Sequence, residues 1–373
     1  MKNSLGVYIH VPFCKKKCRY CDFCSVSGKD EGYMLSYAKE LCKRIKDFLP
    51  RATDHTVDTV YFGGGTPTLL PIDAVKMIMD AVRGFHISPD AEITMECNPA
   101  TADLTYLSRI RDMGVNRISI GLQSASDREL TLLGRAHNRE DFLLCFENAR
   151  RSGFDNISAD LMYGIPDQTL ESFSRSLDLL ADLSPEHISA YGLTIEEGTY
   201  FHKHLSELDI ADDDMQAEMY SMMCARLKER GYRRYEISNF AKPERESRHN
   251  TRYWKGLDYV GFGVAAHSCF DNERFGNSRN IDGFLRGEDI TEERYTLDLD
   301  ERKKEYVMLG MRMENGISLS QYEDRFGVTF PISSPTVKNY IKNEFLRLED
   351  DSLSFTEKGF LVSNVILSEL IEL

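Results

Sequence analysis

The stretch YIHVPFCKKKCRYCDF (residues 8–23) decides how the rest of this sequence is interpreted. It opens with an apolar run typical of a buried strand, and it then carries Cys14, Cys18 and Cys21, separated by three and two residues. Thiolates suit iron–sulfur clusters, and this short spacing lets one loop wrap a cluster. Three ligands for the four irons of a cubane leave one iron open to a small molecule. The stretch therefore predicts a strand followed by a [4Fe–4S] site.

Other interpretations of these cysteines stay open at this point. A structural zinc site usually combines two well-separated cysteine pairs, and the absence of a second pair here counts against zinc. Cys24 lies three residues past Cys21 and offers a fourth thiol, but we expect it to point elsewhere on the loop. The predicted iron ligands are therefore Cys14, Cys18 and Cys21.

Outward from this stretch, apolar runs alternate with helical patterns as far as residue 195. The expected strands cover residues 5–11, 57–64, 92–98, 117–124, 156–165 and 187–195. The helical patterns between them include residues 33–49, 74–85, 104–114 and 141–153. Strands that alternate with helices pair in parallel through right-handed crossovers. We therefore expect an α/β fold, a partial barrel of six strands whose carboxyl-terminal loops form the working face.

The chain changes character after the sixth expected strand. Residues 212–231 predict a helix that ends at Gly231, and residues 234–241 predict a further strand. Beyond residue 300 the order helix, helix, short β-pair, helix suits a smaller, mainly helical, winged-helix-like domain. We expect three parts, namely a barrel over residues 1–235, an extension over residues 236–299 and the helical domain over residues 300–373.

Composition and charge exclude several classes of protein. The 373 residues carry a formal net charge of −14, which repels polyanions, so we expect no nucleic-acid partner. No apolar run approaches the roughly 18–20 residues that span a bilayer, and the amino terminus does not have the pattern of a signal peptide. We therefore expect a cytoplasmic protein. Nine cysteines, an odd number, argue against a disulfide framework in that setting.

The cysteine motif directly after a first strand resembles the radical S-adenosylmethionine (SAM) superfamily. Residues 8–23 resemble the anaerobic coproporphyrinogen III oxidase family of porphyrin biosynthesis and, within it, the HemW-type heme chaperones. The likeness extends over nearly the whole chain. It implies a barrel with a [4Fe–4S] cluster that holds SAM and cleaves it by one-electron reduction, and hence an electron donor as a partner.

The resemblance continues in polar residues at the ends of successive strands. GGGTPTLL (63–70) is similar to the family element that meets the amino group of SAM. Carboxylates and a guanidinium nearby suit the ribose hydroxyls and the methionyl carboxylate. Each such residue alone is more often a strand-end polar group, and the two tyrosines beside the cluster are equally suited to packing. The resemblance implies these SAM-binding residues: Tyr8, Tyr20, Gly64, Gly65, Thr66, Glu96, Gln123, Arg135 and Asp160.

A second motif, SRHNTRYW (247–254), lies after the expected barrel. It resembles the HNxxYW element of the heme chaperones. An imidazole is a good axial ligand of heme iron, and aromatic rings pack on a porphyrin face. Without the resemblance, a histidine satisfied by the backbone in a domain interface is the simpler interpretation. With it, we expect His249 to bind heme, and His267 is a weaker candidate.

Two features separate chaperone from oxidase within this family. Phe23 stands where the oxidase pattern CxxxCxxCxC has a further cysteine, and only thirteen residues precede Cys14, where the oxidase carries a longer stretch that helps to enclose substrate. We therefore expect a heme chaperone that delivers heme to an acceptor protein unknown from the sequence. Oxygen-independent coproporphyrinogen III oxidation and another radical reaction on a tetrapyrrole are the alternatives. A transient membrane association is left open.

Overall fold

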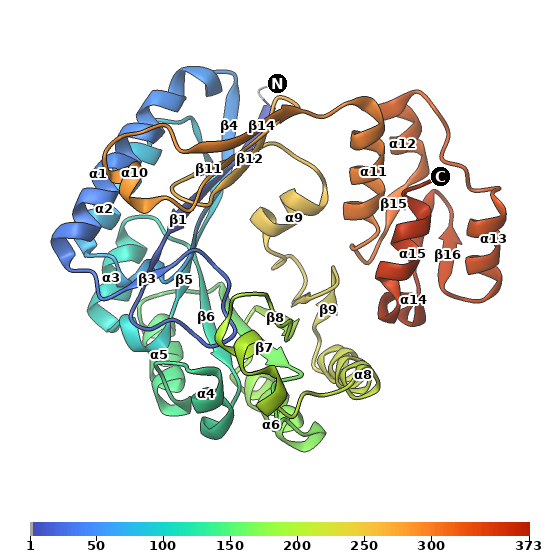
Figure 1. Ribbon diagram of the computed structural model, residues 1–373, viewed down its shortest axis with the longest axis horizontal. Coiled ribbons are helices and arrows are strands. Elements are labelled where there is room, and N and C mark those ends of the chain that lie inside the picture. The colour runs from blue at the N-terminus through green and yellow to red at the C-terminus, as the bar shows by residue number, and fades with distance from the viewer. Residues whose placement is uncertain (1–2) are drawn as a thin grey trace.

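A computed structural model describes residues 3–373, which form a large α/β unit and a smaller, mainly helical one (Figure 1). The large unit is built on a twelve-stranded sheet that curves into an open barrel. Seven neighbouring strands of this sheet run parallel, in the order β11 (Tyr259–Phe262), β1 (Asn3–Val11), β4 (His55–Gly64), β5 (Ile87–Cys97), β6 (Arg117–Gln123), β7 (Ile157–Tyr163) and β8 (His187–Gly192). The six expected strands are therefore all present, and β11 adds a seventh that the sequence did not predict as parallel.

Antiparallel strands extend the sheet at both edges. Beyond β11 lie β12 (His267–Phe270), β13 (Glu273–Asn277) and β14 (Thr291–Thr296), and beyond β8 lie β10 (Asn239–Ala241) and β9 (Arg233–Arg234). The expected single strand over residues 234–241 is wrong. The chain turns between β9 and β10 because Glu236 points into the interior, where it is fully buried and accepts a 3.3 Å hydrogen bond from the Ser238 N–H.

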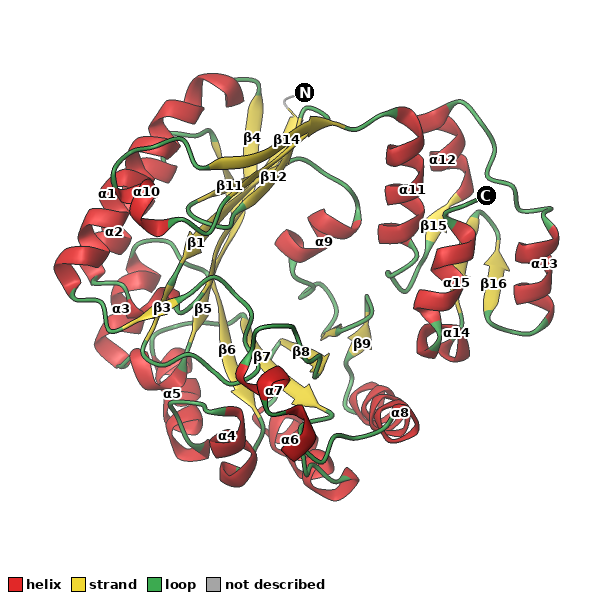
Figure 2. Ribbon diagram, viewed as in Figure 1, coloured by secondary structure: helices red, strands yellow, loops and turns green. Residues whose placement is uncertain are grey.

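Helices cover the outer face of the sheet (Figure 2). They are α1 (Glu31–Phe48), α2 (Ile72–Val82), α3 (Leu104–Asp112), α4 (Asp127–Leu133), α5 (Arg139–Arg151), α6 (Leu170–Leu183) and α8 (Asp213–Glu229). Alternation along β1 sends Val7 and Ile9 into the core beneath these helices, where both are fully buried. Tyr8, which lies between them, faces the barrel interior instead. The same alternation along the other strands places polar side chains inside the barrel.

The helical unit follows β14. It comprises α11 (Leu299–Gly310), α12 (Leu319–Phe326), α13 (Pro335–Lys342), α14 (Glu357–Leu361) and α15 (Ser363–Leu370), around a small sheet ordered β15 (Ile317–Ser318), β17 (Ser352–Phe355) and β16 (Leu346–Glu349). The helix α9 (Arg248–Trp254) lies between this unit and the barrel (Figure 1). The predicted fold class, a partial α/β barrel with a smaller helical domain, is confirmed. No helix within residues 3–373 is both long and apolar enough to cross a membrane.

Candidate functional site

The cysteine-bearing loop leaves the carboxyl end of β1 and is closed at its base. The two-residue strands β2 (Phe13–Cys14) and β3 (Val26–Ser27) pair in parallel, and the Val26 N–H donates to the carbonyl of Pro12 over 2.8 Å. The middle of the loop is also held, because the Arg19 N–H donates to the Leu133 carbonyl at the end of α4 over 2.9 Å. These backbone bonds fix the base and the middle of the loop.

Three thiols of this loop face one cavity of about 490 Å³, a volume typical of a small-molecule site. Cys14, Cys18 and Cys21 line it, whereas Cys24 is buried outside the lining and its carbonyl accepts a 3.0 Å hydrogen bond from His10 Nε2. Burial raises the pKa of the Cys14 thiol and raises that of Cys21 to about 11. Thiolates at this position therefore require a compensating cation, which a bound cluster would supply.

The turn after β4 approaches the cysteine loop so closely that only glycine fits. A Cβ on Gly65 would lie 2.7 Å from the Phe13 carbonyl oxygen and 2.9 Å from that of Val11. Gly64 has a φ of +110°, a backbone angle that residues with a side chain rarely adopt. The hydroxyl of Thr66, in the same turn, donates to Cys14 Sγ over 3.7 Å. The backbone here forms a cradle open to a ligand beside the cysteines.

Two half-buried carboxyl groups face the cavity from strands β5 and β7. Glu96, near the end of β5, accepts from the Tyr61 hydroxyl over 2.8 Å and from the Gly64 N–H over 3.2 Å. Burial raises the pKa of Glu96 to about 7. Asp160 in β7 accepts from the Ser119 hydroxyl over 2.9 Å, and burial raises its pKa as well. Both groups can accept hydrogen bonds from hydroxyl or ammonium groups of a ligand.

A half-buried guanidinium balances these acids at the other side of the cavity. Arg135 follows the left-handed Gly134 that ends α4, and its Nη2 donates to the Gly121 carbonyl over 3.2 Å. Its Nη1 lies 3.6 Å from Cys18 Sγ, and its Nε has no hydrogen-bond partner among residues 3–373. A guanidinium without a carboxylate partner suits the carboxylate of an amino acid or the charge of cluster thiolates. The donor set therefore fits an iron–sulfur cluster and SAM.

The structure brings the predicted residues together with two exceptions. Every residue predicted for the cluster or SAM lines this cavity except Tyr8. The Tyr8 ring packs on Tyr61, with ring centroids 6.2 Å apart, and its hydroxyl lies 3.1 Å from His10 Nδ1. Tyr8 thus packs against Tyr61, which lines the cavity, without lining the cavity itself. The second exception is His249.

His249 lies in α9 with both ring nitrogens engaged. Its Nδ1 lies 2.9 Å from the Thr59 hydroxyl and its Nε2 lies 2.8 Å from the Tyr253 hydroxyl. The ring is fully buried and stacks on Tyr61 with centroids 5.1 Å apart, and burial lowers its pKa to about 3, which keeps it neutral. Its neighbour Asn250 lines the cavity, but His249 offers no free nitrogen in this conformation. The weaker candidate His267 is exposed at the start of β12.

Sequence reasoning missed several cavity residues, most notably Arg117. This arginine begins β6, is only 2% exposed, and its Nε has no hydrogen-bond partner in the described part of the chain. Tyr61 and Tyr191 also line the cavity. The sequence signal for Arg117 was the two-residue period of a strand. Arg117, Ser119 and Gly121 are every second residue of β6, so they lie on one face that leads to Gln123.

Family models place the chain in a class of proteins. Residues 8–180 match the radical SAM superfamily, and residues 297–362 match the HemN C-terminal domain. The solved structure of coproporphyrinogen III oxidase (HemN) from Escherichia coli aligns with a TM-score of 0.87, covering 99% of this chain and 90% of that one. At 23% identity this likeness shows the fold. The fold and the cysteine-lined cavity are those of a radical SAM protein.

Curated relatives define the family more narrowly. The heme chaperone HemW of Bacillus subtilis is 31% identical, and that of Escherichia coli 34%, each over 97% of this chain and 97% of the relative. The heme chaperone HemW of Synechocystis is 36% identical over 85% of this chain and 80% of the relative. The chain belongs to the HemW family.

Proposed function

We propose that this protein binds a [4Fe–4S] cluster through Cys14, Cys18 and Cys21, holds SAM beside it, and binds heme for delivery to an acceptor protein. Membership of the HemW family carries the heme part of the proposal, since relatives along the whole chain are named heme chaperones. The shared cavity of the three thiols supports the cluster part. Bound together, the cluster and SAM would supply one-electron reductive chemistry.

The cavity suggests how the chain would orient SAM. Arg135 would meet the methionyl carboxylate, because it is the buried cation nearest the cysteines. The cradle at Gly64 and Gly65 would receive the amino group beside the open iron. Glu96 and Asp160 would accept hydrogen bonds from the ribose hydroxyls or the ammonium. Their buried positions keep these bonds away from competing water.

A second cavity suggests where heme would approach His249. It measures about 810 Å³ and lies between the barrel and the helical unit, on the other side of α9 from the first cavity. Arg245, Arg248 and Arg252 line it, and arginines suit the carboxylates of heme propionates. Arg248 and Arg252 pair with Asp90 and Asp58 of the same lining, so propionates would compete with these aspartates. Thr59, which bonds His249 Nδ1, lines it too. Heme ligation by His249 would require α9 to shift and break the bond to Thr59 or to Tyr253.

Titration of heme into the cluster-loaded full chain, followed through the Soret band, tests this proposal. His249→Ala should abolish the wild-type spectrum and weaken binding at least tenfold. Tyr253→Phe should bind heme about two- to tenfold more tightly, because it removes one hydrogen bond of about 0.5–1.5 kcal/mol that must break and leaves the imidazole in place. Tyr259→Phe is the matched control, since Tyr259 touches the Tyr253 ring without bonding to His249.

Two outcomes would contradict the proposal. An unchanged spectrum and affinity in His249→Ala would remove that residue as the ligand. Conversion of coproporphyrinogen III by the cluster-loaded protein with SAM and a reductant would favour the oxidase alternative. We expect no product in that assay, because Phe23, which is 67% exposed, occupies the place of the oxidase's further cysteine.

A further inference from the structure

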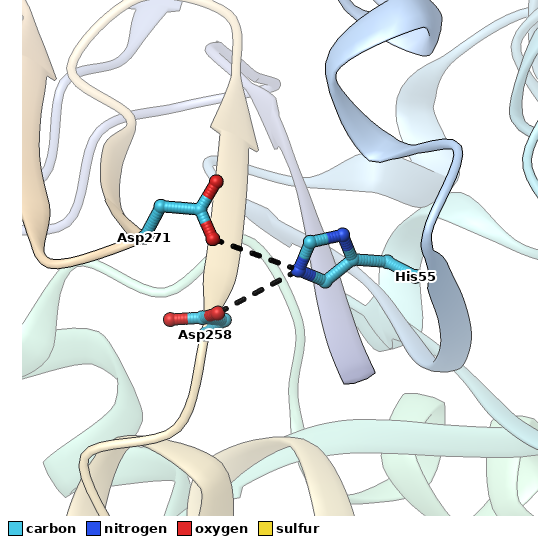
Figure 3. Close-up of side chains that lie close together, drawn as sticks. All are labelled: His55, Asp258 and Asp271. Carbon is cyan, nitrogen blue, oxygen red and sulfur yellow. Dashed lines mark ion pairs between the residues drawn. The ribbon is translucent and has the colours of Figure 1, made fainter. Parts of the chain in front are cut away.

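His55, Asp258 and Asp271 form a cluster of one histidine and two aspartates (Figure 3). His55 is the first residue of β4, whose last residue, Gly64, lines that cavity. A ten-residue strand separates the two sites by about 30 Å. Asp258 directly precedes β11, and Asp271 lies in the turn between β12 and β13. The group therefore has no part in the cluster or SAM site.

The three side chains converge at ion-pair distances, without a hydrogen bond to one another (Figure 3). His55 Nε2 lies 3.7 Å from Asp258 Oδ2 and 4.0 Å from Asp271 Oδ1, distances beyond a hydrogen bond. One ligand atom from each residue lies within 4.8 Å of the other two. His55 is only 5% exposed, and neither of its ring nitrogens has a hydrogen-bond partner among residues 3–373. A buried imidazole aimed at two carboxylates at this spacing is left unsatisfied unless something lies between them.

The surrounding structure holds each of the three residues in place. The His55 ring packs on Phe270 with ring centroids 4.8 Å apart. Asp271 and Asn272 have φ angles of 52° and 62°, the left-handed pair that makes a tight two-residue hairpin turn. The carbonyl of Asp258 accepts a 3.0 Å hydrogen bond from the Gly6 N–H of β1. The backbone that carries the two carboxylates, and the ring of His55, are therefore held in place.

We propose that His55, Asp258 and Asp271 bind a divalent transition-metal ion, with Zn²⁺ as the best match. Zinc binds imidazole nitrogen and carboxylate oxygen at about 2.0–2.2 Å, which places tetrahedral ligands roughly 3.4 Å apart, a small contraction from the observed spacing. The imidazole disfavours Mg²⁺ and Ca²⁺, which prefer all-oxygen sites. The Asp271 side chain is 61% exposed, so water can complete the coordination.

The ion would fasten three segments at one end of the sheet, namely the start of β4, the start of β11 and the β12–β13 hairpin. No hydrogen bond of the His55 ring joins these segments within residues 3–373. Such a site is structural, because it lies far from the SAM cavity. Its expected effect is greater thermal stability of this end of the sheet, with no change in cluster content.

Equilibrium dialysis of the cluster-loaded full chain against buffered Zn²⁺, with zinc and iron measured together, tests this site. Wild type should retain one zinc per chain that Asp271→Asn loses, with affinity weakened at least tenfold and iron unchanged. Asp350→Asn is the matched control, because Asp350 is an exposed aspartate with a φ of 49° in the β16–β17 turn. It should retain the zinc.

Thermal melting with and without Zn²⁺ separates a loss of zinc binding from a loss of folding. Zn²⁺ should raise the melting temperature of wild type and of Asp350→Asn, but not that of Asp271→Asn or His55→Gln. Mg²⁺ at the same concentration should leave all four unchanged. Equal zinc content in wild type and Asp271→Asn, or equal thermal shifts in both, would overturn the site.

Discussion

Single residues in the SAM cavity combine burial with charge. Glu96 and Asp160 are carboxyl groups inside the barrel, and near them lie the buried guanidinium group of Arg117 and the half-buried one of Arg135. Removing such groups from water costs free energy unless a ligand or a neighbour compensates. Within residues 3–373, Glu96 accepts from two donors, the Tyr61 hydroxyl and the Gly64 N–H, and burial outweighs them and raises its pKa to about 7. Its protonation state should therefore change near neutral pH.

This raised pKa predicts a pH dependence of SAM binding. At pH 6 most of the Glu96 carboxyl is protonated in the free protein, and at pH 8 most is ionised. A ligand that donates to the ionised form lowers this pKa, so binding releases a proton and tightens as pH rises. We expect SAM affinity of the cluster-loaded protein to increase by up to about tenfold from pH 6 to pH 8. Calorimetry at the two pH values should show this rise in wild type and a flat profile in Glu96→Gln.

At the scale of an element, the cysteine loop behaves as one unit. Pairing of β2 with β3 closes its base, and backbone bonds of Arg19 hold its middle. This arrangement turns Cys14, Cys18 and Cys21 toward the cavity and leaves Cys24 buried behind, where its carbonyl meets His10. The four thiols of one short loop therefore divide into two environments.

That division predicts which thiols the cluster needs. After anaerobic reconstitution, Cys14→Ala, Cys18→Ala and Cys21→Ala should each lose most of the cluster iron and sulfide, because a cubane with two protein thiolates is poorly held. Cys24→Ala is the matched control from the same loop and should retain the full content. Iron loss in Cys24→Ala equal to that in the other three would give Cys24 a ligand role.

At the scale of the whole molecule, a charged contact joins the barrel to the helical unit. Arg234 of β9 donates through Nε to Glu314 over 2.9 Å, and its guanidinium lies 3.8 Å from the centroid of the Phe360 ring. The Arg234 side chain is 9% exposed, so Glu314 supplies most of its compensation. Arg347 also donates to Glu314 over 3.4 Å. This group is one of the contacts that join the two units, beside the backbone bridge between Glu236 and Met313.

Removal of the Glu314 carboxylate should weaken the contact between the barrel and the helical unit. Glu314→Gln leaves the buried Arg234 without its counter-charge and should lower the free energy of unfolding by about 1–3 kcal/mol. Protease cleavage between β14 and α11 should also become faster. Glu288→Gln breaks the exposed Arg286–Glu288 pair and should change neither measurement. Equal protease sensitivity of Glu314→Gln and wild type would contradict this role.

The alternation of apolar strands and helical runs sufficed to predict the barrel, because each strand buries its face locally against a neighbouring helix. The same logic failed at residues 234–241, where Glu236 turns inward and breaks an otherwise strand-like run. The parallel pairing of β11 with β1 could not be predicted from the sequence either, because about 250 residues separate the partners Gly6 and Tyr259. Pairing at such a distance depends on the closure of the whole sheet.

The sequence alone determined the cysteine motif, the order of the barrel strands and the family resemblance, because each is a pattern within a short stretch of chain. The tertiary structure decided what those residues meet. It showed Arg117 inside the SAM cavity, both nitrogens of His249 already engaged, and His55 facing two aspartates more than 200 residues away in the chain. Contacts between distant segments follow from how the sheet closes and what it buries, and no local pattern encodes them.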